Sequence, residues 1–199
     1  MRDIDYLFSK VRPYAANCPE PLMAAHLRKA AIILCQRTRC WRERDTFQTT
    51  GDEVEILALP PQASLFEIEE ARFNDMLLER SRPRGEIAMY GEGQPQYITQ
   101  LAHNTVSLQP RGVGTLWLSM FLRPSQNADM LPDILMDEFA DALGHGALST
   151  LLLIQNEPFS NPQLGMFYAQ QFTDVLDRNF AYNVRGQQRA AKRSKARFL

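Results

Sequence analysis

The sequence predicts a mixed α+β fold, in which helices near the two ends of the chain pack as a bundle and an antiparallel, β-rich region is inserted between them. Apolar residues recur at helical spacing near both ends, and they alternate with polar residues over much of 41–123. Apolar residues make up 45% of the 199 residues and charged residues 23%, so a folded core is expected and wholesale disorder is excluded. We expect N-terminal helices over 1–40, a β-rich insertion over 41–123, C-terminal helices over 131–184 and a basic arm over 185–199.

The first 40 residues carry two segments with helical spacing. The first is short and ends at Pro13; its apolar residues are Ile4, Leu7, Phe8 and Val11. A longer helix is predicted over 21–39, because Pro19 and Pro21 suit its first turn. Its apolar stripe consists of Met23, Leu27, Ala30 and Leu34.

The region 41–123 has the pattern of a sheet of five to seven short antiparallel strands. Gly51-Asp52 between 46–49 and 54–57 predicts one hairpin, and 97–99 followed by 106–108 predicts a second. Residues 65–73 read as a strand that ends at the turn pair Asn74-Asp75. Residues 116–122 are apolar on both faces, which indicates a central strand, and 81–95 is rich in Gly, Pro and charge, which indicates a long surface loop.

Two helices are predicted to close the body. The first begins with Asp133 as its cap and continues to about Ile154, and small residues at 144, 146, 147 and 149 allow a neighbouring helix to approach closely, within or between subunits. The second begins at Asn161-Pro162 and extends to about Asn183.

Charge is distributed unevenly along the chain. Of 22 basic residues, seven lie in 178–199, where there is no acid, so residues 1–177 hold 15 basic and 23 acidic side chains and a net charge of −8. A basic tail on an acidic body is typical of a segment that binds a partner of opposite charge, and Phe198-Leu199 at its end favours a docking arm over a solvated tail. A DNA-binding module that uses the same tail is the alternative.

Motifs of catalysis and of cofactor or metal binding are missing from the sequence. His26, His103 and His145 lie in unrelated contexts, and the phosphate-binding and nucleophile motifs are absent. Cys35 and Cys40 are too loosely spaced for a zinc site, and three cysteines give no disulfide framework. We interpret Glu67, Glu69 and Glu70 as a solvated strand face; a small enzyme that uses such carboxylates is the weakest reading. We therefore expect no catalytic, cofactor-binding or metal-binding residue and no cofactor.

The start of the chain and its apolar pattern also bear on location. Acids near Met1 and the lack of a long apolar run exclude a secretory signal and a transmembrane helix. We expect a protein made in a reducing cytoplasm and not bound to a membrane.

Four blocks of sequence, in this order, resemble bacteriophage head–tail adaptor (connector) proteins. Residues 27–43 (LRKAAIILCQRTRCWRE) resemble a helix that ends at an aromatic residue and leads into strands, and 104–110 (NTVSLQP) resembles a later strand. Residues 122–152 carry L-R-P-S, L-P-D, D-E-F and G-A-L in the family's order, and 156–172 resembles the start of its last helix. The resemblance spans about residues 22–180.

The resemblance implies a structural virion protein and not an enzyme, with a helical bundle and a β-rich insertion. Such adaptors form a ring of twelve copies below the portal, extend the channel for double-stranded DNA without sequence-specific binding, and provide the platform for the downstream tail proteins. The implied location is the head–tail neck of the virion, assembled in the host cytoplasm. A head-completion stopper or a tail terminator is the alternative position. The implied portal contacts are Arg185, Arg189, Lys192, Arg193, Lys195, Arg197, Phe198 and Leu199.

Overall fold

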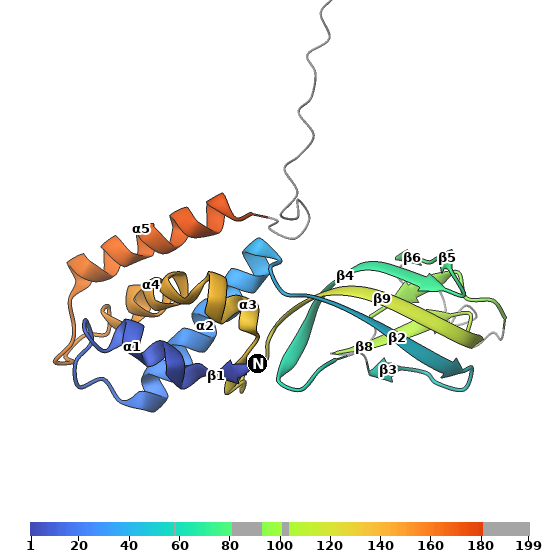
Figure 1. Ribbon diagram of the computed structural model, residues 1–199, viewed down its shortest axis with the longest axis horizontal. Helices are drawn as coiled ribbons and strands as arrows, with labels where there is room; N and C mark the ends of the chain where they lie inside the picture. The colour runs from blue at the N-terminus through green and yellow to red at the C-terminus, as the bar shows by residue number, and fades with distance from the viewer. Residues whose placement is uncertain (58, 81–92, 101–103, 181–199) are drawn as a thin grey trace, which may run out of the picture.

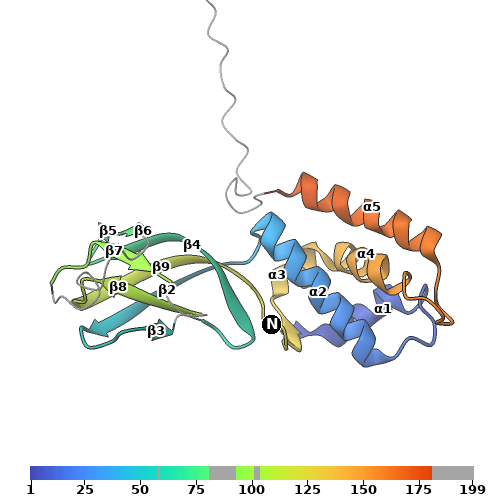
Figure 2. The same cartoon turned by 180° about the vertical axis from the view of Figure 1, so that it is seen from behind.

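Helices gather at one end of the molecule and most strands at the other (Figures 1 and 2). The computed structural model describes residues 1–57, 59–80, 93–100 and 104–180. The mixed α+β class is confirmed. Within the described ranges, no helix combines the length and the apolar character that crossing a membrane requires.

The helical end is built from both ends of the chain. Its elements are η1 (Ile4–Leu7), α1 (Phe8–Val11), α2 (Glu20–Thr38), α3 (Asp133–Glu138), α4 (Ala140–Leu151) and α5 (Pro162–Arg178). Helix α4 packs against α1, α2 and α5, so segments more than 100 residues apart share one apolar cluster. Leu27, Leu34, Leu143 and Leu151 are among its fully buried side chains.

Helix α2 follows the prediction closely. Its N-cap position is Pro19, and all four residues of the predicted apolar stripe are buried. The helix ends at Arg39, whose φ of 52° is left-handed, and the chain turns there toward the strands. Residue Trp41 is buried beside this turn and continues the core from the helices into the sheet.

The predicted helix 133–154 is wrong in two respects. It is divided into α3 and α4 at Phe139, whose φ of −126° and ψ of 13° are not helical and whose side chain is buried. The N-cap position belongs to Pro132 and not to Asp133, and the Asp133 carboxylate instead binds Arg2 Nε at 2.9 Å. The last helix is capped by Asn161 as predicted, with Leu164 N–H donating to its side chain at 3.1 Å, but it ends at Arg178 and not near 183.

The small residues of α4 serve packing inside the chain. A Cβ on Gly146 would lie 2.8 Å from Ala30 Cβ on α2 and 3.0 Å from the Phe172 ring on α5. A Cβ on Gly144 would lie 2.9 Å from Lys10 Cβ. The close approach predicted from these glycines is therefore made by α1, α2 and α5 of the same subunit.

Among the described residues, the single sheet predicted in 41–123 is in fact two four-stranded sheets, and a two-stranded one lies outside that region. The first has the order β2 (Arg42–Thr50), β9 (Val113–Pro124), β4 (Ala63–Phe73) and β5 (Met76–Leu77). The second has the order β3 (Ile56–Leu57), β8 (Thr105–Gln109), β7 (Tyr97–Thr99) and β6 (Glu79–Arg80), in which β6 and β7 run parallel. The third pairs β1 (Arg2–Asp3) with β10 (Met130–Leu131).

Strand β9 is central, as predicted, because it lies between β2 and β4. Its side chains Leu116, Leu118, Met120 and Leu122 are fully buried and share the apolar cluster with residues of β8. The strand predicted over 65–73 and the turn at its end are confirmed: Asn74 and Asp75 join β4 to β5 with φ values of 47° and 66°. The antiparallel pairing of β7 with β8 is confirmed as well.

The hairpin predicted around Gly51-Asp52 does not form. Strand β2 pairs with β9 along its whole length, and β3 pairs with β8 in the other sheet. The Glu53 carboxylate accepts the N–H groups of Thr50 and Gly51, each at 3.0 Å. These donors are therefore engaged locally, and the chain leaves the first sheet at this turn.

Candidate interaction face

One face of the first sheet carries charged, polar and aromatic side chains, among which Phe121 and Ser119 are buried. The register aligns Arg42 with Phe121 and Glu67, and Thr46 with Trp117 and Arg72. Since alternate residues of a strand lie on one face, this face is opposite to the buried leucines of β9. We call it the charged face; its members are Arg42, Arg44, Thr46, Glu67, Glu69, Glu70, Arg72, Thr115, Trp117, Ser119 and Phe121.

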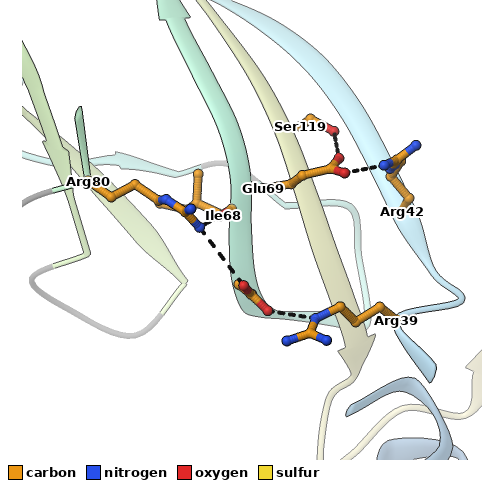
Figure 3. Close-up of polar contacts among 7 residues, drawn as sticks. Arg39, Arg42, Ile68, Glu69, Arg80 and Ser119 are labelled. Carbon is orange, nitrogen blue, oxygen red and sulfur yellow. Dashed lines mark hydrogen bonds and ion pairs between the residues drawn. The ribbon is translucent and has the colours of Figure 1, made fainter. Parts of the chain in front are cut away.

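Glu67 joins the helical end to both sheets. Arg39 Nε at the end of α2 binds Glu67 Oε2 at 2.8 Å, and Arg80 Nη1 of β6 lies 3.9 Å from Glu67 Oε1. The same Arg80 nitrogen donates to the carbonyl of Ile68 at 2.7 Å (Figure 3). One carboxylate therefore bridges three elements at the joint between helices and strands.

Glu69 is held from two neighbouring strands. Its carboxylate pairs with Arg42 of β2 and accepts a hydrogen bond from Ser119 Oγ of β9 at 2.6 Å (Figure 3). The Arg42 and Glu69 side chains are only 24% and 25% exposed, so water screens this pair poorly. The Arg42 guanidinium also lies over the Phe121 ring, 5.5 Å from its centroid, which fixes it further.

The interpretation of the three glutamates as a solvated face is wrong. Each of them forms an ion pair, because Glu70 also accepts from Arg72 Nε at 2.5 Å. Two register shifts in β4, between Leu65 and Glu67 and between Ile68 and Glu70, place these successive glutamates on one face. The spacing in sequence hides such bulges, so the pairing was not predictable from it.

A shallow groove of about 480 Å³ crosses the charged face above Trp117. Arg44, Glu70, Arg72 and Asp75 line its edges, and the Arg72 guanidinium lies 5.7 Å from the centroid of the Trp117 ring. An open groove with both signs of charge and an indole at its floor suits contact with another polar protein surface.

A second pocket, of about 280 Å³, lies among α1, α4 and α5. Tyr14 and Tyr168 meet edge to face with ring centroids 5.4 Å apart, and burial together with a hydrogen bond to Tyr14 raises the pKa of Tyr168 to about 12. His145 stacks on Tyr168 with centroids 5.2 Å apart, as a packed histidine of the helix. At the rim, the hydrogen bond from Lys10 lowers the pKa of Asp141.

Two of the three histidines have defined places, and neither belongs to a metal site. Burial lowers the pKa of His145, whose Nδ1 has no hydrogen-bond partner among the described residues. His26 Nδ1 lies 2.6 Å from Thr150 Oγ1, whereas His103 lies outside the described residues. Within the described ranges, no three side chains of the kinds that ligate metals come together.

The residues predicted to contact the portal cannot be placed on these surfaces. Arg185, Arg189, Lys192, Arg193, Lys195, Arg197, Phe198 and Leu199 all lie outside the described residues, as does most of the predicted loop 81–95. The described chain reaches only two residues beyond Arg178, the end of α5.

Comparison with known proteins adds no relative. None of the family models matches the chain, and none of the curated proteins is similar to it in sequence.

Proposed function

We propose that this protein is a structural component of a bacteriophage particle, a head-to-tail adaptor that forms a ring of twelve copies below the portal. In this proposal it extends the channel for the genome, provides the attachment platform for the tail, and carries out no catalysis. The proposal places it in the head–tail neck of the virion, assembled in the host cytoplasm without a cofactor.

The order of the elements carries this proposal. Helices α1 and α2 precede all strands of the two larger sheets, helices α3 to α5 follow them, and α4 packs against α1, α2 and α5. This order supports the helical bundle with a β-rich insertion that the resemblance implies for adaptors. The element order and the four resembling blocks of sequence are separate observations that favour the same family.

Charge supports the same role. Residues 1–177 carry a net charge of −8, and a negative wall does not hold the phosphates of a passing duplex. Several surface arginines and lysines of the body are already paired with carboxylates, among them Lys10, Arg39, Arg42 and Arg72. The arm 185–199 adds six further cations and no acid.

Surfaces for contact between copies are present at both ends of the molecule. The charged face supplies paired charges around Trp117 at the strand end. Tyr14, Met166 and Phe167 are exposed at the helical end, and exposed apolar groups of this size are typical of protein contacts. A ring requires two different surfaces that meet head to tail, and these two are distinct.

The test is binding to capsids that carry a portal but no adaptor. We expect the full chain to cosediment with them and to appear as a ring at one vertex by electron microscopy. A chain ending at residue 184 keeps every described residue and should melt at the same temperature but no longer cosediment. A chain with Phe198 and Leu199 changed to Ser retains all cations of the arm. If it no longer cosediments, docking needs the apolar contacts; if it still does, the ionic contacts are sufficient. Normal docking of the truncated chain would refute the assignment of the arm.

DNA binding by the basic tail is the competing function. It predicts a shift of duplex DNA in a gel that weakens steeply as salt is raised, and that is lost in the chain ending at residue 184. Full binding to capsids with no DNA shift at any salt concentration would exclude this alternative. A protein absent from purified virions would exclude both the adaptor and the stopper or terminator positions.

A further inference from the structure

Two of the three cysteines lie in contact at the joint between helices and strands. Cys35 is in the last turn of α2 and Cys40 follows the end of that helix, and their Sγ atoms are 4.0 Å apart. Both side chains are buried, and neither sulfur is part of a disulfide. The left-handed Arg39 turns the chain back at the helix end, which brings Cys40 over Cys35.

The two sulfurs differ in acidity, and this difference sets the order of a reaction. The hydrogen bond with Cys35 lowers the pKa of Cys40, with further help from Thr38 and from backbone N–H groups. Burial raises the pKa of Cys35 well above its ordinary value. Because the thiolate is the nucleophile, Cys40 attacks first and Cys35 acts as the resolving thiol.

We propose that Cys35 and Cys40 form a modification site, at which a small-molecule disulfide such as oxidised glutathione converts the two thiols into one intrachain disulfide. The Cys40 thiolate attacks the reagent, forms a mixed disulfide and releases one thiolate. Cys35 then loses its proton and attacks the Cys40 sulfur, which releases the second thiolate. Two protein thiols and one reagent disulfide give one protein disulfide and two reagent thiols, so electrons and protons balance. The inference does not depend on the proposed function.

The disulfide would fasten the last turn of α2 to the short link between α2 and β2. Only Arg39, Cys40 and Trp41 connect these two elements, so the bond closes a loop around the turn itself. Thiols stay reduced in a reducing compartment and form disulfides in an oxidising one. The bond would therefore close the joint only under oxidising conditions.

The matched control is Cys18, which is also buried and free but whose described contact is with the carbonyl of Pro19. The folded full chain is incubated in glutathione buffers of increasing oxidised fraction, then alkylated, and its free thiols are counted by mass spectrometry. We expect two of the three thiols to disappear together, and digestion to give a linked pair of peptides containing Cys35 and Cys40. Cys18→Ser should leave this unchanged, whereas Cys35→Ser should retain Cys40 as a mixed disulfide with glutathione.

Three results would overturn the proposal. One is that all three thiols still react with the alkylating reagent after long incubation in the most oxidising buffer. Another is a linked peptide that contains Cys18. The third is a Cys35–Cys40 bond that forms only after unfolding in urea and lowers the melting temperature of the refolded chain, because the native joint would then not accommodate it.

Discussion

Gly146 lies where α2, α4 and α5 come closest, and its replacement by alanine measures how tight that junction is. The new Cβ would lie 2.8 Å from Ala30 Cβ and 3.0 Å from two atoms of the Phe172 ring. Ordinary carbon contacts are about 3.5–4.0 Å, so the new Cβ would lie up to roughly 1 Å too close to these atoms, and they would have to move apart. Ala30 Cβ is fixed to the backbone of α2, and a whole helix therefore has to move.

Two opposing contributions set the sign of the effect. Overpacking of this kind costs about 1–3 kcal/mol, whereas alanine gains about 1 kcal/mol over glycine in helix propensity. We expect Gly146→Ala to be destabilising by about 1 kcal/mol, which lowers the melting temperature of a chain of this size by roughly 2–4 °C. Gly165→Ala is the matched control, because its Cβ meets the flexible end of Leu153 at 3.2 Å and Leu152 Cβ only at 3.4 Å, close to an ordinary contact.

Thermal unfolding followed by circular dichroism tests this reasoning. The control variant should melt at or slightly above the temperature of the unchanged protein. The double variant with Ala30→Gly removes the methyl group that the new Cβ meets, so it should cost less than the sum of the two single changes. A Gly146→Ala variant that melts higher than the unchanged protein, as expected from propensity alone, would show that the helices are not in close contact there.

Three other outcomes follow from contacts described above. Glu69→Gln should lower the free energy of unfolding in urea by about 2 kcal/mol, because it leaves the half-buried Arg42 unpaired. Glu70→Gln breaks a more exposed ion pair and should lower the same free energy by under about 1 kcal/mol. Asn161→Ala removes the cap of α5 and should cost about 1 kcal/mol in the same assay; no loss would mean that the cap is not formed in solution. Burial lowers the pKa of His145, so its imidazole binds a proton more tightly in the unfolded chain than in the folded one. The free energy of unfolding should therefore fall as the pH drops below 6.5, the ordinary pKa of histidine. His145→Gln should flatten that decline, and an unchanged slope would contradict the assignment.

Local signals in the sequence predicted local structure well. Asn161 followed by proline marks the start of α5, and the stripe from Met23 to Leu34 marks the buried side of α2. The pair Asn74-Asp75, both left-handed in the structure, marks the turn at the end of β4. In each case the decisive interaction lies within a few residues, so the pattern contains it.

The errors concern interactions between distant residues. Strand β2 pairs with β9, about 70 residues away, and nothing near Gly51 records that preference. Helical periodicity does not indicate the break at Phe139, where the backbone leaves the helical conformation. The ion pairs of Glu67 and Glu69 depend on bulges and on the register of three strands. Alternating arginines and glutamates in 39–44 and 67–72 were the only sequence signal for them.

The strand region leaves the helical end at Trp41 and returns at Leu122, and these two points are side by side because the Leu122 N–H donates to the Trp41 carbonyl at 2.9 Å. A segment whose two ends touch can be lengthened, shortened or exchanged without changing the span that its host must bridge. Evolution can therefore remodel the strand region as a cassette while the helices keep their geometry. The same closeness gives protein engineers a natural junction for excising that cassette or grafting another one in its place.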